Sequence, residues 1–204
     1  MINLHSKPKI SEKIDKMRKE YKQNGIPTIL NDSLNFLLLN VQIKNPKKIL
    51  EIGTATGMSG ISMLNVASPD AHLTTIEKDE QSFIEAKANF KECNLSHKVT
   101  QFCGDAGEII KFLNGEFDFI FLDGAKARYL DYMPELLRLL SKKGVLFADN
   151  VLFRGYVDGS VPYSHSDNTI VRNLRDFINE MTNNSNLTTQ ILNIGDGILL
   201  SIKD

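Results

Sequence analysis

The stretch FDFIFLDGAK, residues 117–126, decides how this chain folds, because its apolar run ends abruptly at Asp123. A second run, VLFADN at residues 145–150, ends in the same way at Asp149 and Asn150. Apolar runs this short predict strands that are buried on both faces, as in a parallel sheet. Open α/β sheets bind their ligands just beyond the carboxyl ends of such strands. The two stretches therefore predict an α/β fold with a polar site at that edge of the sheet.

The rest of the chain alternates between short apolar segments and longer amphipathic ones. The expected parallel strands are residues 48–52, 72–76, 99–102, 118–122 and 145–148. The expected helices are residues 57–66, 79–92, 105–114, 130–140 and 167–181. Alternation of this kind implies right-handed crossovers and a mainly parallel sheet with helices on both faces. Segments 187–194 and 198–202 flank Gly195-Asp196-Gly197, which predicts a C-terminal hairpin that adds an antiparallel edge and completes seven strands.

Length and composition favour one globular domain over residues 1–204. The chain is 42% hydrophobic and 24% charged, with a net charge of -1, so no overall attraction to nucleic acid or membrane is expected. Residues 8–23 predict an amphipathic helix, and a second helix follows residues 31–33, so residues 1–43 form a helical extension. Residues 1–22 carry seven Lys or Arg and three acidic residues, a net charge of +4.

The chain shows no sign of export or membrane insertion. It contains neither the apolar core of a signal peptide nor a run of about 18 apolar residues, so a cytoplasmic protein is expected. Cys93 and Cys103 form no metal-binding or redox motif. Two reduced thiols are therefore expected.

A glycine-rich turn, EIGTATGMS at residues 51–59, follows the first expected strand. Glycine lets a ligand approach the backbone, and the following helix offers free N–H groups. The G-x-x-x-G spacing disfavours a dinucleotide site, and a turn without any ligand is the alternative. At the ends of the next two strands, Glu77 could accept ribose hydroxyls and Asp105 an adenine amine. An exposed carboxylate and a helix N-cap are the respective alternatives.

The acidic strand ends suit a metal ion. Asp123, Asp149 and Asn150 together offer two carboxylates and an amide oxygen, a hard donor set typical of Mg²⁺. Lys126 lies three residues after Asp123, and a neighbouring cation would favour its neutral form, which could act as a general base. Loop capping by the acids and a solvated Lys126 are the alternatives.

These segments together resemble the cation-dependent O-methyltransferase family, which includes catechol and caffeoyl-CoA O-methyltransferases. The matching segments are residues 51–59, 75–77, 104–106, 117–126, 149–152 and 194–197. The resemblance implies a Rossmann-like class I methyltransferase fold, S-adenosylmethionine as cofactor, and Mg²⁺ or another hard divalent cation. It also implies a homodimer, with the helices of residues 8–43 packed across it.

The resemblance also assigns roles to individual residues. The cofactor is expected along Ile29, Glu51, Gly53, Ala55, Ser59, Glu77, Asp105, Ala106 and Asp123. The metal ligands are expected to be Asp123, Asp149 and Asn150, and the base Lys126. Arg154, which follows the metal-binding segment, is expected to contact the substrate.

The substrate has two candidates. Residues 123–129 and 150–155 are most similar to bacterial members that methylate 5-hydroxyuridine at the tRNA wobble position, whose adjacent oxygens could chelate a metal as a catechol does. The tRNA anticodon loop is then the partner, and the basic first helix could meet its phosphates. The alternative is a small catechol-type or caffeoyl-CoA-type acceptor. A third hypothesis, a non-catalytic nucleotide-binding module, is disfavoured because Asp123, Lys126, Asp149 and Asn150 are all present.

Overall fold

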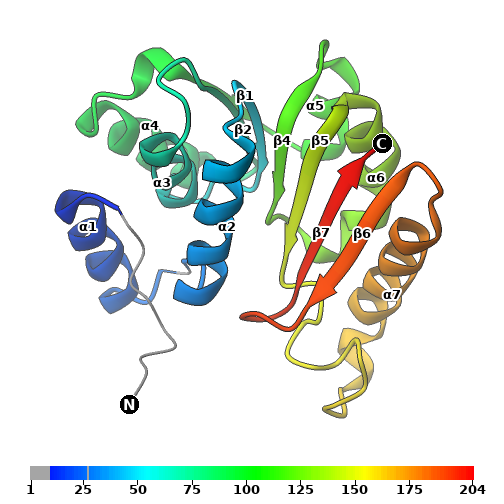
Figure 1. Ribbon diagram of the computed structural model, residues 1–204. Coiled ribbons are helices and arrows are strands. Elements are labelled where there is room, and N and C mark those ends of the chain that lie inside the picture. Colours follow the sequence, from blue (N-terminus) through cyan, green and yellow to red (C-terminus); the bar gives the residue numbers. More distant parts are fainter. Residues whose placement is uncertain (1–9, 27) are drawn as a thin grey trace, which may run out of the picture.

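The protein is a three-layer α/β structure with one twisted sheet in the middle (Figure 1). The computed structural model describes residues 10–26 and 28–204. Seven strands lie in the order β3-β2-β1-β4-β5-β7-β6. Helices α1 to α4 cover one face, and α5 to α7 cover the other. The predicted fold, with a mainly parallel sheet and an antiparallel C-terminal hairpin, is confirmed.

The bounds of the elements follow the predicted alternation closely. The strands are β1 (Lys48–Ile52), β2 (His72–Glu77), β3 (Val99–Cys103), β4 (Phe117–Leu122), β5 (Leu140–Asp149), β6 (Leu187–Leu192) and β7 (Ile198–Lys203). The helices are α1 (Glu12–Gln23), α2 (Asn31–Lys44), α3 (Met58–Val66), α4 (Glu80–Glu92), α5 (Ala106–Phe112), α6 (Tyr129–Leu139) and α7 (Asn168–Asn183). Short 3₁₀ turns are η1 (Ser96–Lys98), η2 (Lys126–Arg128) and η3 (His165–Asp167).

The order of the strands places the site. The chain adds β2 and β3 on one side of β1, then returns to add β4 and β5 on the other. Strand β1 is parallel to both β2 and β4, and β4 is parallel to β5. The direction of winding thus reverses between β1 and β4, and ligands of open sheets bind at such a reversal.

Three elements begin three or more residues away from their predicted starts, and the other boundaries differ by at most two residues. Helix α1 begins at Glu12, after Ser11 caps it by accepting a hydrogen bond from the Ile14 N–H; residues 8 and 9 of the predicted helix lie outside the described residues. Helix α2 begins at Asn31, earlier than predicted. Strand β5 begins at residue 140 rather than 145, because an irregular register against β4 accommodates the polar residues 141–144.

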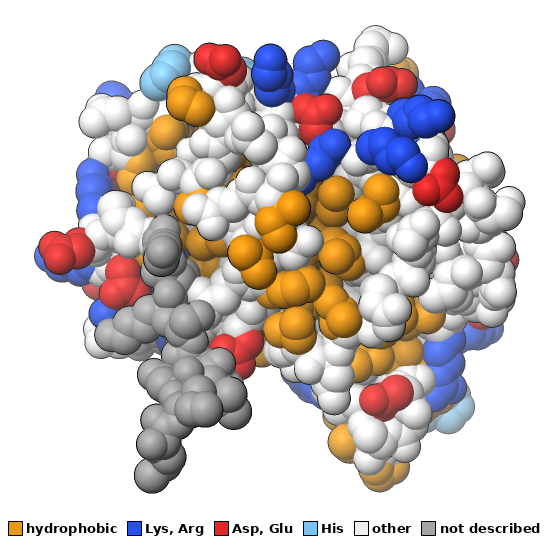
Figure 2. Space-filling model, viewed as in Figure 1, with side chains coloured by type: hydrophobic (Ala, Val, Ile, Leu, Met, Phe, Trp, Pro, Cys, Tyr) orange, Lys and Arg blue, Asp and Glu red, His pale blue; other side chains and the backbone are white. Residues whose placement is uncertain are grey.

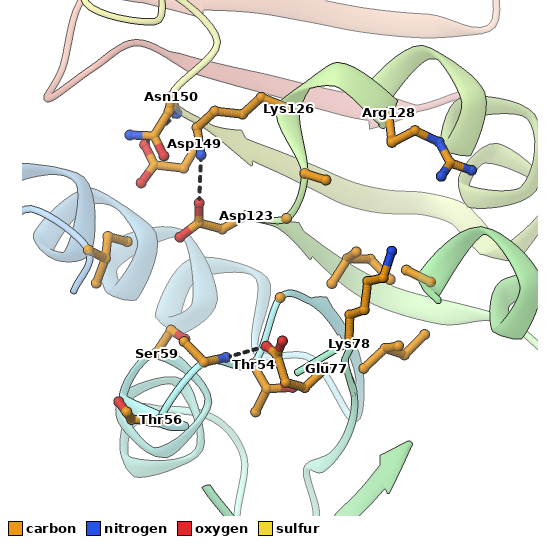
Figure 3. Close-up of a pocket in the computed structure, with 18 of the residues that line it drawn as sticks. Thr54, Thr56, Ser59, Glu77, Lys78, Asp123, Lys126, Arg128, Asp149 and Asn150 are labelled. Carbon is orange, nitrogen blue, oxygen red and sulfur yellow. Dashed lines mark hydrogen bonds and ion pairs between the residues drawn. The ribbon is translucent and has the colours of Figure 1, made fainter. Parts of the chain in front are cut away.

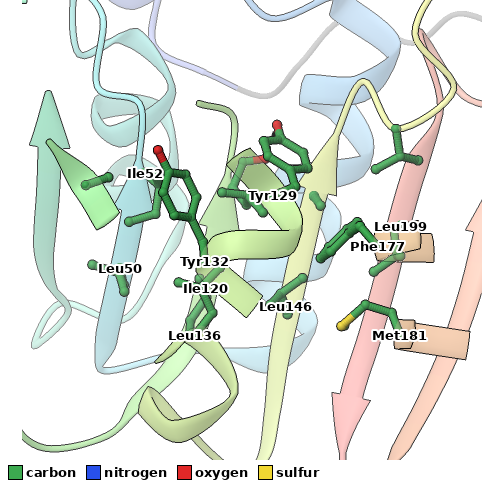
Figure 4. Close-up of a cluster of buried hydrophobic side chains, with 14 of the residues drawn as sticks. Leu50, Ile52, Ile120, Tyr129, Tyr132, Leu136, Leu146, Phe177, Met181 and Leu199 are labelled. Atoms are coloured by element: carbon green, nitrogen blue, oxygen red, sulfur yellow. Dashed lines mark hydrogen bonds between the residues drawn. The ribbon is translucent and has the colours of Figure 1, made fainter. Parts of the chain in front are cut away.

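Both faces of the sheet are packed with apolar side chains. One cluster joins the sheet to α5, α6 and α7 and includes Tyr129, Leu146 and Phe177 (Figure 4). The other joins it to α1 through α4. No helix in the described part of the chain is long and apolar enough to cross a membrane.

Candidate active site

A cavity of about 820 Å³ opens at the carboxyl ends of β1, β2, β4 and β5 (Figure 3). Residues from sequence-distant turns line it, as expected where the sheet reverses its winding. The predicted site residues that line it are Ile29, Gly53, Ala55, Ser59, Glu77, Asp105, Ala106, Asp123, Lys126, Asp149 and Asn150. Glu51 and Arg154 are the two predicted site residues that do not line it.

The glycine-rich turn at residues 51–59 packs against the backbone of Asp123, the residue that follows strand β4. Gly53 has a φ of 95°, and a Cβ there would lie 2.2 Å from the backbone oxygen of Asp123. Only glycine fits such an approach. The Ala55 N–H donates to a Glu77 carboxylate oxygen at 2.7 Å, and the other Glu77 oxygen accepts from the Asp79 N–H at 2.9 Å. The Glu77 carboxylate is therefore fixed at the cavity edge, with lone pairs left for a ligand's hydroxyls.

Glu51 lies beneath this turn, fully buried in the wall of the cavity. Its carboxylate accepts hydrogen bonds from the hydroxyls of Ser59 and Thr75. The pKa of Glu51 is raised to about 7, chiefly by burial and also by the charges of Asp123 and Glu77, against the lowering effect of the two hydroxyls. The structure therefore places Glu51 as a support for Ser59, which itself lines the cavity.

Asp105 lies at the far end of the cavity from Asp149. It precedes α5 as the N-cap residue, but its side chain makes no capping hydrogen bond. Its carboxylate instead lies 3.6 Å from both Lys78 Nζ and an Arg128 terminal nitrogen. Arg128 also stacks over the Tyr132 ring at 5.4 Å from its centroid. Sequence reasoning missed Lys78, Arg128 and Tyr132, because their proximity depends on how the turn after β2 meets α6.

The other end holds the acidic strand ends. Asp149 is 1% exposed, and its carboxylate accepts from the Asn150 N–H at 2.9 Å. Burial and the nearby charge of Asp123 raise the pKa of Asp149 to about 7, and burial also raises the pKa of Asp123. Lys126 Nζ lies 3.5 Å from Asp123 Oδ1 (Figure 3). Two neighbouring carboxylates that repel each other, here the buried Asp149 and the half-buried Asp123, are stabilised by a bound cation.

The donor set at this end fits a hard divalent cation. The described residues contain no group of three or more His, Cys, Asp or Glu side chains placed to hold a metal. A cation here would therefore take the two carboxylates of Asp123 and Asp149 with the amide oxygen of Asn150, an all-oxygen set of the kind Mg²⁺ prefers.

Two contacts that hold these residues in place were not predicted. The Tyr129 hydroxyl is fully buried and lies 3.2 Å from the backbone oxygens of both Leu122 and Asp149, so it ties the ends of β4 and β5 together. Asp196, in the turn before β7, accepts from the Arg154 N–H and from the Leu152 N–H. The C-terminal hairpin thus holds the loop that leaves the acidic site. The sequence shows both residues but not these contacts, which join distant turns.

Arg154 takes part in this loop through its backbone. Its side chain stacks over the Phe153 ring at 5.7 Å from the centroid, outside the cavity lining. Phe153, Tyr156 and Tyr163 follow one another with ring centroids 5.6 and 5.8 Å apart. The loop after the acidic site therefore presents an aromatic cluster as well as a cation.

Comparisons with known proteins agree with this geometry. The profile described as O-methyltransferase matches residues 5–204. A candidate caffeoyl-CoA O-methyltransferase from Staphylococcus aureus has a solved structure similar to this one, with 31% identity, a TM-score of 0.87, and coverage of 95% of this chain and 93% of that one. The O-methyltransferase TomG of Streptomyces achromogenes, solved in complex with S-adenosylmethionine, shares 26% identity, with a TM-score of 0.82 and coverage of 96% and 91%. Caffeoyl-CoA O-methyltransferase of Stellaria longipes is 26% identical over 94% of this chain and 83% of its own length. The chain thus belongs to the O-methyltransferase family.

Proposed function

We propose that this O-methyltransferase moves the methyl group of S-adenosylmethionine to one of two adjacent oxygens on a small catechol-type or caffeoyl-CoA-type acceptor, with a divalent cation. One observation carries the proposal: Asp123, Asp149 and Lys126 face the same cavity as the glycine-rich turn and Glu77. A donor site and an acceptor site are thus combined in one space. The caffeoyl-CoA-type relatives favour this class of acceptor.

The donor half of the cavity suits a nucleoside-bearing sulfonium. Glu77 offers carboxylate lone pairs for ribose hydroxyls, and Asp105 offers a carboxylate for an exocyclic amine. Gly53 lets this turn pack directly against the backbone of Asp123, where a side chain would collide, and so brings the donor half next to the acidic site. S-adenosylmethionine, when bound, supplies an activated methyl group on sulfur, and TomG was solved with this donor.

The acceptor half is built to bind two oxygens and remove a proton. Asp123, Asp149 and Asn150 would hold the cation, which when bound lowers the pKa of a hydroxyl that contacts it. Lys126 Nζ lies 3.5 Å from Asp123 Oδ1, beside the acidic site, and is the side chain assigned as general base for the acceptor hydroxyl. The rigid turn at Gly53 holds donor and acceptor halves at a fixed offset, and such positioning supplies much of the rate in group transfer.

Two features bear on the acceptor. The aromatic cluster of Phe153, Tyr156 and Tyr163 lies on the loop after Asn150, outside the cavity lining, and aromatic rings next to the acidic site favour a flat phenolic acceptor. The exposed lysines of α1, among them Lys16 and Lys19, favour a second candidate, 5-hydroxyuridine in a tRNA anticodon loop. Both candidates present adjacent oxygens, so one assay compares them.

The test offers labelled S-adenosylmethionine and Mg²⁺ with either catechol, a caffeoyl thioester or tRNA that carries 5-hydroxyuridine. We expect transfer to the small acceptors, its loss with EDTA, and its loss in Asp149→Asn but not in the exposed control Asp70→Asn. Lys126→Met should lower kcat by about 10²-fold or more, as removal of a general base does. Transfer to tRNA alone would replace the acceptor assignment. Transfer undiminished by EDTA would remove the cation, and no binding of S-adenosylmethionine would remove the donor.

We also propose that the protein works as a homodimer. Hydrophobic side chains gather over α2 and the strands beside it (Figure 2). Among them, Leu39 and Ile43 on α2 are 50% and 75% exposed, and Ile202 on β7 is 38% exposed. An apolar group of this kind marks a protein interface. Ile43→Asp should convert the dimer to a monomer in sedimentation, whereas Ile84→Asp, at an exposed position on α4, should not; a wild-type monomer at micromolar concentration would refute the dimer.

A further inference from the structure

Arg18 on α1 is a buried cation whose hydrogen bonds are incomplete. It is 6% exposed, although arginine is almost never buried without a partner. One terminal nitrogen donates to the Ile29 backbone oxygen at 3.1 Å and to the Asn31 side-chain oxygen at 3.3 Å. Its Nε has no hydrogen-bond partner among the described residues. A buried N–H without a partner costs free energy, so this guanidinium is not fully satisfied by the described residues.

A recess lies beside this arginine. It has a volume of about 280 Å³ and is lined by Asp15, Arg18, Lys19, Lys22 and residues 28–31. Its four charged residues are spaced i, i+3, i+4 and i+7, so they share one face of α1. Three are cations and one is an anion, and Lys19 Nζ already pairs with Asp15 Oδ2 at 2.5 Å. The face therefore keeps an excess of positive charge around Arg18.

The recess adjoins the reaction cavity. Residues 28–30 line both, so the two spaces lie against the same short segment. Arg18 holds this segment in place through its hydrogen bond to the Ile29 backbone oxygen. A ligand in the recess would thus lie next to a molecule in the cavity.

We propose that the recess of Arg18, Lys19 and Lys22 binds a phosphate group of the acceptor. Arginine and lysine together are suited to phosphate, arginine through its directed N–H groups and lysine as a point charge. The claim that this phosphate belongs to the acceptor rests on the proposed function. The claim that the recess binds a phosphate group does not depend on that function. The acceptor would then reach from the cation site in the cavity, past residues 28–30, to α1.

Arg18 also has a purely structural role, since it joins α1 to the segment before α2. That role accounts for its terminal nitrogen, and the ion pair with Asp15 accounts for Lys19, but neither gives a role to Lys22. The two roles give different results for Lys22, which is exposed and can be changed without disturbing the packing of α1.

Direct binding tests the recess without any methyl transfer. Inorganic pyrophosphate is titrated by calorimetry into the wild type, Lys22→Ala and the matched control Lys16→Ala. Lys16 is on the same helix, is exposed and does not line the recess. We expect Lys22→Ala to weaken binding on the order of tenfold, as loss of a charge-assisted contact does, and Lys16→Ala to match the wild type. Equal affinities of wild type and Lys22→Ala, or equal weakening in both variants, would overturn the proposal.

Two further probes identify the source of the phosphate. Coenzyme A and a short single-stranded RNA are titrated into the same three proteins. If the recess recognises the phosphate of one probe, the affinity for that probe falls in Lys22→Ala and not in Lys16→Ala. If Lys22→Ala weakens binding of neither probe, the recess has no role in acceptor binding. Methylation of phosphate-free catechol by the wild type is measured separately. Its failure would contradict the proposed function and leave the pyrophosphate result standing.

Discussion

Replacing Glu51 by glutamine should change how the stability of this protein depends on pH. Glu51 is fully buried, and its pKa is raised from 4.5 to about 7, chiefly by burial. Between these two pH values the unfolded chain is ionised while the folded protein keeps the proton. The folded state therefore loses stability as pH rises from about 4.5 to about 7, and the loss is complete above that range.

The structure gives the size of this effect. Each pH unit between the two pKa values is worth about 1.4 kcal/mol, so the full loss is about 3 kcal/mol. Glutamine keeps the shape of the side chain and carries no charge, and the hydroxyls of Ser59 and Thr75 can donate to its oxygen or accept from its amide. Glu51→Gln should thus match the wild type near pH 4 and exceed it by about 3 kcal/mol at pH 8.

Urea unfolding followed by circular dichroism, with EDTA present, measures the difference at pH 4, 5, 6, 7 and 8. A difference of about 3 kcal/mol corresponds to a midpoint shift of about 1–2 M urea. Taking the difference between the two proteins at each pH removes the contribution of every group that does not interact with Glu51, whereas the repulsion between Asp123 and Glu51 is part of the measured difference. Glu116→Gln, at an exposed position, is the matched control and should run parallel to the wild type. A difference between Glu51→Gln and the wild type that stays constant with pH would refute the reasoning.

Two further changes probe the backbone that joins the halves of the site. Gly53→Ala should destabilise the protein by more than about 3 kcal/mol and weaken binding of S-adenosylmethionine, because its Cβ would lie 2.2 Å from the Asp123 oxygen. Gly115→Ala, which also has a positive φ but an open surrounding, should cost only about 1 kcal/mol in the same thermal unfolding assay; equal losses would show that the close approach does not matter. Tyr129→Phe should cost about 1–2 kcal/mol by removing the hydroxyl contact to the Leu122 and Asp149 oxygens, and should lower kcat while donor affinity, measured by calorimetry, stays constant. An unchanged kcat would show that the spacing of β4 and β5 is set without this contact.

The sequence was sufficient to predict the sheet and eleven of the residues that line the cavity. Apolar runs that stop at an acidic residue mark buried strands and their carboxyl ends. The sequence alone therefore places Asp123 and Asp149 at the same edge of the sheet. The early start of β5 could not be read in this way, because residues 141–144 are polar and join the sheet only through an irregular register.

Contacts between turns that are distant in the sequence could not be predicted, for a different reason. The family resemblance places Glu51 along the cofactor, but its burial depends on α3 closing over it with Ser59. Likewise, the i, i+4 pattern of Arg18 and Lys22 predicts a shared helix face, yet only packing against residues 28–31 turns that face into a recess. Local pattern determines which residues share a face, and tertiary packing determines what that face meets.

The close approach of Gly53 to Asp123 has a consequence for how such an enzyme can diversify. The hydrogen bonds between strands β1 and β4, in which Ile52 pairs with Leu122, fix the position of one half of the cavity relative to the other. The distance between the methyl donor and the acceptor oxygen is therefore set by the main chain. Residues 28–30 and the loop after Asn150 can vary to admit new acceptors without altering that distance. The methyl-transfer chemistry then stays the same while the acceptor changes.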